Sequence, residues 1–228
     1  MSNWSDTLAV FDLETTGIDV ETSRIVSATV AIIDREGAVL ERVDWLLDPG
    51  IEIPAQATNV HGITTEDAVA NGRGAAEGVA EIVATIREHL GRGLPLVAYN
   101  APYDLTLLNR ESLRHGVLPL VAPSPVVDPL VIDKAIDRYR KGKRTLEVTS
   151  AFYGVSLDDA HDSGADAIAA GRVAQAIVRA HGGKLPATVT ELHELQAKWS
   201  LEQAESFQAY MRRERDPEFV AVGGWPER

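Results

Sequence analysis

The stretch LAVFDLETTG, residues 8–17, decides how the rest of the chain can be arranged. Its apolar run, Leu8–Leu13, predicts a strand that is buried on both faces. Asp12 and Glu14 lie two positions apart in that strand, so their side chains would project to the same side. The Thr-Thr-Gly that follows lets the backbone turn sharply and leaves its amide groups near whatever the two acids bind. The stretch therefore indicates either a platform for a metal ion or a solvated turn that carries two acids.

Two apolar-rich segments follow this strand. Residues Ile25–Asp34 and Ala38–Asp48 alternate in part between apolar and polar side chains, and Glu36-Gly37 between them reads as a tight turn. The three strands predict an antiparallel meander. Residues 76–90 then carry apolar side chains at helical spacing, and Leu94–Tyr99 reads as another buried strand. We expect this helix to cross between parallel strands, which makes the sheet mixed.

The second half of the chain is expected to be mostly helical. Asp166 falls in the first turn of one helix, where the helix dipole favours an acid. The fold class is therefore α/β, with a mixed sheet of five strands flanked by helices. The remaining segments are helices expected at Asp104–His115, Pro129–Tyr139, Thr145–Tyr153 and about 188–215, and a short strand at Val126–Asp128.

One domain with a short extension is the expected organisation. Residues 1–183 are interpreted as the main domain, and residues 184–228 as a C-terminal helical extension that packs on it, because the apolar positions of the extension suit packing on the core. The glycine-rich NGRGAAEG (71–78) lacks the Gly-Lys-Ser/Thr ending of a phosphate-binding loop. It is interpreted as the approach to a helix.

Composition narrows the class of protein. The chain has 228 residues, of which 45% are apolar, so it can bury a sizeable core. No segment has the length of a membrane span, and MSNWSDTLAV lacks the basic flank and apolar run of a signal peptide, so we expect a cytoplasmic protein with no membrane partner. The absence of cysteine leaves carboxylates and histidines as strong metal ligands, which favours hard cations such as Mg²⁺ or Mn²⁺.

The charge of the chain argues against a protein that coats nucleic acid nonspecifically. Lys and Arg total 22 against 34 Asp and Glu, a formal net charge of −12, so the chain as a whole should repel a phosphate backbone. The segment Lys134–Arg144 is an exception, with six basic residues and one acid. It is either a solvated helix end and loop or a guide for a nucleic acid strand.

Two further short contexts place acids where a strand ends or a helix begins. AYNAPYD (98–104) ends in Asp104, and HDSGAD (161–166) begins with His161 and ends in Asp166. Such places are where side chains from distant parts of an α/β chain can converge on one cleft. Together with FDLETTG (11–17), these contexts indicate metal-dependent cleavage of a nucleic acid from its end.

The three contexts resemble the three motifs of the DEDDh (DnaQ-like) 3′–5′ exonuclease family, whose best-known member is the proofreading epsilon subunit of bacterial DNA polymerase III. Their order and spacing also agree with that family. Asp12 and Glu14 correspond to the first motif, Asp104 in NAPYD to the second, and His161 with Asp166 to the H-x4-D form of the third.

This resemblance, which runs from about Leu8 to Ala180, implies a ribonuclease H-like fold and the release of nucleoside 5′-monophosphates from a 3′ end. It implies a two-metal mechanism with Mg²⁺ or Mn²⁺, in which one ion activates water and the other stabilises the departing 3′ oxygen. His161 would take the proton from the water, because histidine readily exchanges a proton near neutral pH. The four metal ligands would be Asp12, Glu14, Asp104 and Asp166.

The resemblance also implies contacts to the terminal nucleotide. Thr15 and Thr16 would hold it through backbone amides, and His61 in VHGIT corresponds to the histidine of the family's substrate loop. Tyr103 stands where the second motif usually has Phe, and is carried over as a substrate contact with an added hydroxyl. Gln56 stands where proofreading members often have an acid.

Several functions are compatible with the same motifs. The substrate is expected to be the 3′ end of single-stranded DNA, but a ribonuclease or short-oligonucleotide exonuclease would use the same five residues. The motifs also leave open a noncatalytic polymerase accessory protein and an unrelated metal-dependent phosphatase. The segment after Gly183 is short for a separate tethering domain. We therefore favour a stand-alone exonuclease over a committed replicase subunit, with a DNA polymerase as a possible partner.

Overall fold

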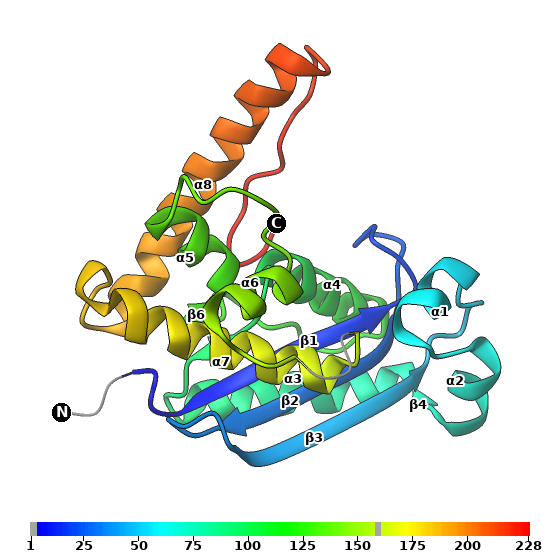
Figure 1. The fold of residues 1–228 in the computed structure, drawn as a ribbon. Helices are drawn as coiled ribbons and strands as arrows, with labels where there is room; N and C mark the ends of the chain where they lie inside the picture. The colour runs from blue at the N-terminus through cyan, green and yellow to red at the C-terminus, as the bar shows by residue number, and fades with distance from the viewer. Residues whose placement is uncertain (1–3, 158–160) are drawn as a thin grey trace.

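A six-stranded sheet forms the centre of the protein, shown in Figure 1. The structure, a computed structural model, describes residues 4–157 and 161–228. The strand order is β4-β3-β2-β1-β5-β6, in which β1, β2 and β3 are antiparallel neighbours and β5 and β6 run parallel to β1. The strands are β1 (Leu8–Thr15), β2 (Ile25–Ile33), β3 (Val39–Asp48), β4 (Arg73–Gly74), β5 (Leu96–Val97) and β6 (Val126–Val127).

The predicted mixed α/β sheet is confirmed, but the prediction of five strands is wrong. The additional strand, β4, is a two-residue segment that pairs in parallel with the end of β3 at Leu47 and Asp48. It lies within the glycine-rich segment that was expected only to lead into a helix. A Cβ at Gly72 would lie 2.6 Å from the backbone nitrogen of Asp48, so glycine lets the two backbones approach closely enough to pair.

Helices cover both faces of the sheet, as Figure 1 shows. On one face, α3 and α4 pack on side chains such as Phe11 and Trp45. On the other, α7 packs on Val10 and Ile33, and α5 and α6 lie beside it. The helices are α1 (Ala55–His61), α2 (Thr65–Asn71), α3 (Ala75–Gly91), α4 (Ala101–Arg114), α5 (Pro129–Ile136), α6 (Leu146–Tyr153), α7 (Ser163–His181) and α8 (Val189–Glu214).

Close packing of α7 on β1 brings the start of this helix to the end of that strand. A Cβ at Gly171 would lie 2.5 Å from Cγ1 of Val10 and 2.6 Å from Cδ1 of Ile33, so only glycine permits this approach. The first turn of α7 contains Asp166, as predicted. The fold therefore places an acid of the third motif beside the acids at the end of β1.

Short elements were the least predictable from sequence. Helices α1 and α2 have seven residues each, and neither has an apolar stripe long enough to show a helical period. Helix α4 begins at Ala101, three residues before Asp104, and α5 ends at Ile136 before Tyr139. Strand β5 has only two residues, although a longer buried strand was expected.

The C-terminal segment contacts the body of the protein through the first turns of α8 and through its last residues, where Glu227 accepts from Asn109 of α4 over 2.6 Å. Leu192 is fully buried in the core, and Gln196 and His193 contact β6 at the edge of the sheet. Figure 1 shows the rest of α8 projecting from the body, with residues 215–228 running back beside it. The domain boundary at residue 183 stays a prediction. Within the described parts of the chain, no helix has the length and apolar character needed to cross a membrane.

Candidate active site

Three of the predicted site residues meet where β1 ends and α7 begins. Carboxylate oxygens of Glu14 and Asp166 and a ring nitrogen of His161 all lie within 4.8 Å of one another. Glu14 is buried in the strand, Asp166 is half-buried and His161 is exposed. Ligand atoms this close can share one cation, and their different exposures leave the site open on the side of His161.

A hydrogen bond within the third motif connects His161 to Asp166 at the start of α7. His161 has a φ of 71°, a left-handed conformation that is uncommon for residues other than glycine. Its backbone N–H donates to Oδ2 of Asp166 over 3.2 Å, and Asp162 caps the helix by accepting from the backbone N–H of Ala165 over 3.0 Å. Oδ1 of Asp166 is buried and has no hydrogen-bond partner among the described residues. This oxygen is therefore free to bind a ligand.

Asp104 reaches the site from the first turn of α4, where it is buried. The preceding Asn100 also has a left-handed backbone, with a φ of 67°. Asp128 holds this turn, because its carboxylate accepts from the backbone N–H groups of Asn100 and Ala101, each over 3.0 Å. It also caps α5 by accepting from the N–H of Leu130 over 2.9 Å. One buried carboxylate therefore ties the start of α4 to the start of α5.

Asp128 was not predicted as a site-forming residue. A signal was present, because Asp followed by Pro129 is typical of a helix N-cap with proline at the first helical position. Nothing local showed that the same carboxylate would also bind a second helix. Burial raises the pKa of Asp128 to about 6, and the hydrogen bonds that its carboxylate accepts from four backbone N–H groups oppose this shift.

The acids of the site repel one another. Burial raises the pKa of Asp12 well above its usual range, and the charges of Asp104 and Glu14 raise it further. Burial likewise raises the pKa of Glu14 to about 8, with a contribution from Asp166. The pKa of Asp104 is also raised, mainly by burial. Such a group of carboxylates favours the binding of positive charge.

The site thus suits hard divalent cations. Its donor groups are carboxylates and one imidazole. Among the described residues, His161 is the one basic side chain among the main electrostatic contributors to the pKa shifts of Asp12 and Asp166, and it acts on Asp166. Asp166 also has a buried carboxylate oxygen without a hydrogen-bond partner among the described residues. The charges of Asp104, Glu14 and Asp166 all raise the pKa of Asp12. Asp12 is therefore electrostatically coupled both to the acid on α4 and to the acids that lie beside His161. The structure therefore brings all five predicted motif residues into one electrostatic cluster.

Tyr103 and Thr15 connect the second motif to the turn after the first. Their hydroxyl oxygens are 2.6 Å apart, and each lies within hydrogen-bond distance of the carbonyl of Gly17, at 2.6 Å for Tyr103 and 2.8 Å for Thr15. Two hydroxyl protons are shared among three contacts, so one hydroxyl donates to the other, which donates to Gly17. The hydroxyl that distinguishes tyrosine from phenylalanine thus anchors this turn. A role of Tyr103 in substrate contact stays a prediction.

Thr16 and His61, the other predicted substrate contacts, also have partners in the protein. The Thr16 hydroxyl accepts from the N–H of Arg24 over 3.0 Å, and Nδ1 of His61 accepts from the N–H of Ile63 over 3.2 Å. The pKa of His61 is lowered, mainly by burial and also by the charge of His161, although the backbone of Thr15 opposes this shift. His61, at the end of α1, therefore lies beside the site, although its role stays a prediction.

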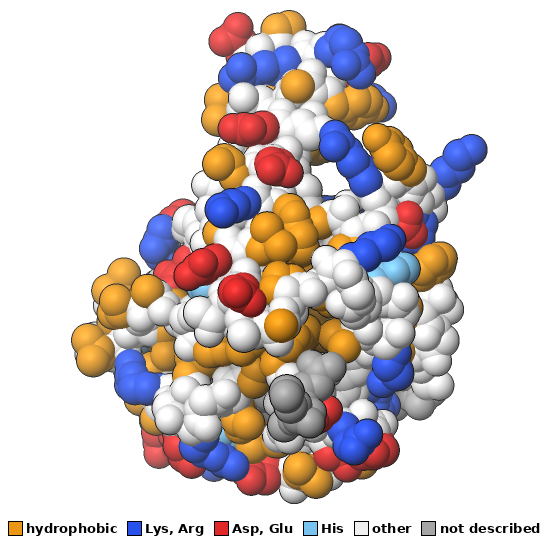
Figure 2. Space-filling model, turned by 90° about the vertical axis from the view of Figure 1, so that its left-hand side faces the viewer, with side chains coloured by type: hydrophobic (Ala, Val, Ile, Leu, Met, Phe, Trp, Pro, Cys, Tyr) orange, Lys and Arg blue, Asp and Glu red, His pale blue; other side chains and the backbone are white. Residues whose placement is uncertain are grey.

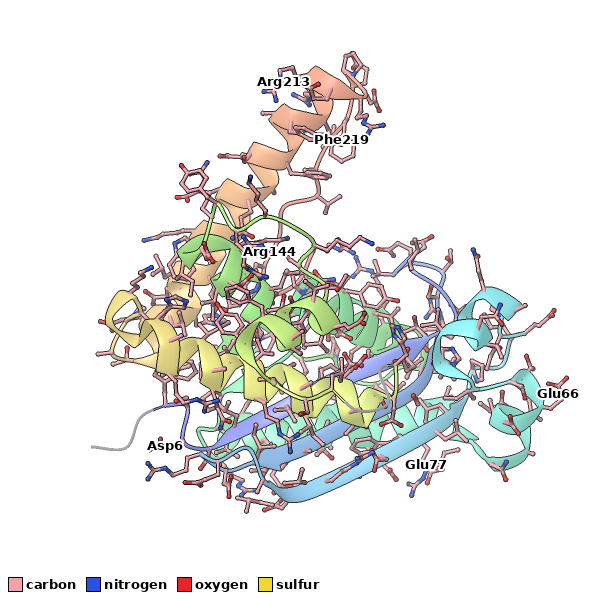
Figure 3. All side chains as sticks on the ribbon, in the orientation of Figure 1. Asp6, Glu66, Glu77, Arg144, Arg213 and Phe219 are labelled. Atoms are coloured by element: carbon pink, nitrogen blue, oxygen red, sulfur yellow. The ribbon has the colours of Figure 1, made fainter. Side chains whose placement is uncertain are left out.

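Part of the basic segment 134–144 is structural. Arg140 and Arg144 both form ion pairs with Asp133, which is fully buried, and the exposed fractions of their side chains are only 8% and 11%. Tyr153 donates to the same carboxylate over 3.0 Å. Figure 3 shows Arg144 between α5 and α6. Burial and pairing with Asp133 indicate a structural role for these two arginines, and a strand-guiding role for the segment stays a prediction.

Sequence comparison places the chain among known nucleases. A model of the RNase T family, described as an exonuclease, matches residues 9–174. The chain belongs to this exonuclease family. The predicted resemblance to DEDDh (DnaQ-like) exonucleases is thereby confirmed, and the five motif residues all lie within the matched segment.

Curated relatives with DNA polymerase III names are much longer than this chain. A DNA polymerase III PolC-type protein of Streptococcus thermophilus is 32% identical over 170 residues, which is 73% of this chain and 11% of the relative. A DNA polymerase III subunit epsilon-like protein of Rhodobacter capsulatus is 34% identical over 155 residues, 67% of this chain and 21% of the relative. The chain thus spans a tenth to a fifth of the length of these relatives.

Solved structures of exonuclease I share the fold. One exonuclease I structure aligns with a TM-score of 0.65 and 22% identity, covering 76% of this chain and 41% of the other. A complex of Escherichia coli exonuclease I with a dA16 oligonucleotide aligns with a TM-score of 0.66 and 20% identity, covering 78% of this chain and 42% of the other. The predicted ribonuclease H-like fold is confirmed.

Proposed function

We propose that this exonuclease removes nucleoside 5′-monophosphates from the 3′ end of single-stranded DNA and requires Mg²⁺ or Mn²⁺. The convergence of the five motif residues at the end of β1 carries the proposal. The oligonucleotide complexes of structural neighbours and the polymerase names of relatives support DNA as the substrate. A DNA polymerase partner is compatible with the names of the same relatives.

Each side chain has a distinct task in this proposal. Asp12, Glu14, Asp104 and Asp166 would hold the cations, which neutralise charge on the phosphodiester and on the departing 3′ oxygen when bound. His161, on the exposed side of the cluster, would accept the proton of the attacking water at its imidazole. The turn anchored by Tyr103 would position backbone amides beside the terminal nucleotide.

The first prediction concerns the need for metal and for a free end. Hydrolysis of labelled single-stranded DNA should be abolished by EDTA and restored by Mg²⁺ or Mn²⁺, because the acids of the site repel one another unless a cation is bound. Circular single-stranded DNA should not be cut. Full activity in EDTA, or cutting of the circle by pure protein, would contradict the proposal. A labelled RNA of the same sequence, assayed in parallel, would separate a deoxyribonuclease from a ribonuclease.

The second prediction concerns His161. Replacement by Ala should reduce turnover about 100-fold or more, which is the scale of a lost general base. If His161 moves a proton, Mn²⁺ should stabilise the variant against heat nearly as much as it stabilises the wild type. Single-turnover hydrolysis and thermal unfolding with and without Mn²⁺ measure the two effects. Wild-type turnover would remove His161 from the mechanism, and loss of the Mn²⁺ response would make it a metal ligand instead.

A further inference from the structure

A continuous groove lies between α8 and the segment that includes α5. One hollow of about 610 Å³ lies between the basic segment 134–144 and one face of α8. A second hollow of about 510 Å³ lies between α5, α8 and the C-terminal tail. Lys134, Gln203 and Phe207 line both, so the two hollows adjoin. We call them together the α5–α8 groove.

The second hollow of the groove borders the start of the helix that carries Asp104. This hollow is lined by Asn100 and Pro102, at the start of α4, which carries Asp104 two residues further on. Asp128, which holds that start of α4, also lines it. A strand whose end lay in the site could therefore continue past α4 into the groove.

The charge of the groove differs from that of the whole chain. Against a net charge of −12, the first hollow is lined by four cationic side chains and one acid, Glu202. Arg140 and Arg144 are paired with Asp133, whereas Lys134 and Arg138 form no ion pair with any described residue and are exposed. Two cations are thus available for a ligand. Figure 2 shows Lys and Arg side chains around a hollow beside the projecting part of the molecule.

Aromatic side chains line the opposite wall. Trp199, Phe207 and Tyr210 follow one another at spacings that place them on one face of α8, and Phe207 and Tyr210 are 52% and 45% exposed. Phe219 of the tail, visible against α8 in Figure 3, packs edge-on against Phe207 with ring centroids 5.5 Å apart. Exposed rings opposite unpaired cations suit bases that stack and phosphates that need neutralisation.

We propose that the α5–α8 groove binds the part of a single-stranded nucleic acid that lies upstream of the 3′ end in the active site. The proposal rests on the proposed exonuclease function and adds the track that selects long single strands. The family match ends at residue 174, so α8 and the tail provide this track in addition to the matched nuclease segment. Duplex nucleic acid keeps its bases stacked inside the helix, so it cannot use the aromatic wall.

The test compares binding of 20-nucleotide and 4-nucleotide single strands by fluorescence anisotropy in EDTA. The double variant Lys134→Glu, Arg138→Glu should weaken binding of the 20-mer about 10-fold or more. It should also reduce the slope of log affinity against log salt by about 1.4, at ~0.7 for each lost phosphate contact. Phe207→Ala should weaken 20-mer binding about 5-fold, as expected for loss of one stacked base. The ratio of 20-mer to 4-mer affinity should fall in both variants.

Lys198→Glu is the matched control, because Lys198 is an exposed cation on α8 that does not line the groove. Circular dichroism should show that all variants are folded. Unchanged 20-mer affinity, an equal loss in Lys198→Glu, or an equal loss for blunt duplex DNA would overturn the proposal. Because the assay measures binding without divalent cations, it remains decisive for the groove even if the protein proves not to hydrolyse DNA.

Discussion

Asp104→Asn should lose hydrolysis by on the order of 100-fold or more, the scale of a lost charge-stabilising group, while the metal-free protein becomes no less stable. Asp104 is 4% exposed, and its carboxylate lies among other acids. Removing its charge relieves repulsion in the folded state, so the melting temperature in EDTA should stay equal or rise. The rise that Mn²⁺ gives should shrink, because one ligand is lost. Thermal unfolding with and without Mn²⁺ measures both effects.

The pH dependence of stability provides an internal check on this variant. Glu14 has a folded pKa of about 8 against 4.5 ordinarily, so between these values the folded state binds more protons than the unfolded chain. Metal-free stability should therefore fall as pH rises through this window. The fall should be shallower in Asp104→Asn, because one fewer carboxylate has a raised pKa. Glu66→Gln, at an exposed acid on α2, is the control and should follow the wild type.

A different result would give Asp104 a different role. If the variant melts clearly lower in EDTA and still responds fully to Mn²⁺, Asp104 supports a hydrogen-bond network at the start of α4. It would then not be a metal ligand. That outcome would leave the remaining acids, Asp12, Glu14 and Asp166, as the centre of the site.

Asp133→Ala should produce the largest loss of stability, about 3–5 kcal/mol in the free energy of unfolding. The substitution leaves Arg140 and Arg144, both nearly buried, without their common counter-charge, and leaves the hydroxyl of Tyr153 without its acceptor. Urea unfolding followed by circular dichroism measures the loss. Asp137→Ala is the control. The Asp137 side chain is partly exposed and its carboxylate is as far as 4.0 Å from Nε of Arg140, so the substitution should lower the free energy of unfolding by less than about 1 kcal/mol. Similar losses in both variants would contradict a structural role specific to Asp133.

The cluster of motif residues was predictable because its information is local. Asp12 and Glu14 end an apolar run, and Asp104 and Asp166 fall in first turns of helices that their flanking sequences mark. The parallel pairing of β1 with β5 then brings the ends of these elements to one side of the sheet. Short-range patterns and one topological rule were therefore enough to predict which residues converge.

The remaining features depend on contacts between segments distant in sequence. The cations of the segment 134–144 look equivalent in sequence, yet two of them turn inward to Asp133 while Lys134 and Arg138 remain exposed. Asp128 looks like an ordinary helix cap until its second set of partners, at Asn100 and Ala101, is seen. Tertiary packing decides which ion-pair and hydrogen-bond partners these side chains have, and the periodicity of the sequence does not predict them.

The contact of α8 with β6 has a consequence for self-association. The outer edge of a sheet normally offers its free N–H and C=O groups to any passing strand, and proteins must block such edges to avoid aggregation. Here His193 accepts from the N–H of Val126 over 3.0 Å, and Gln196 donates to the carbonyl of Val126 over 3.0 Å and accepts from the N–H of Asp128 over 2.6 Å. Two side chains of a helix thus occupy the positions of a seventh strand. The C-terminal segment thereby covers this edge of the sheet and blocks edge-to-edge pairing with another strand there, which is independent of any substrate.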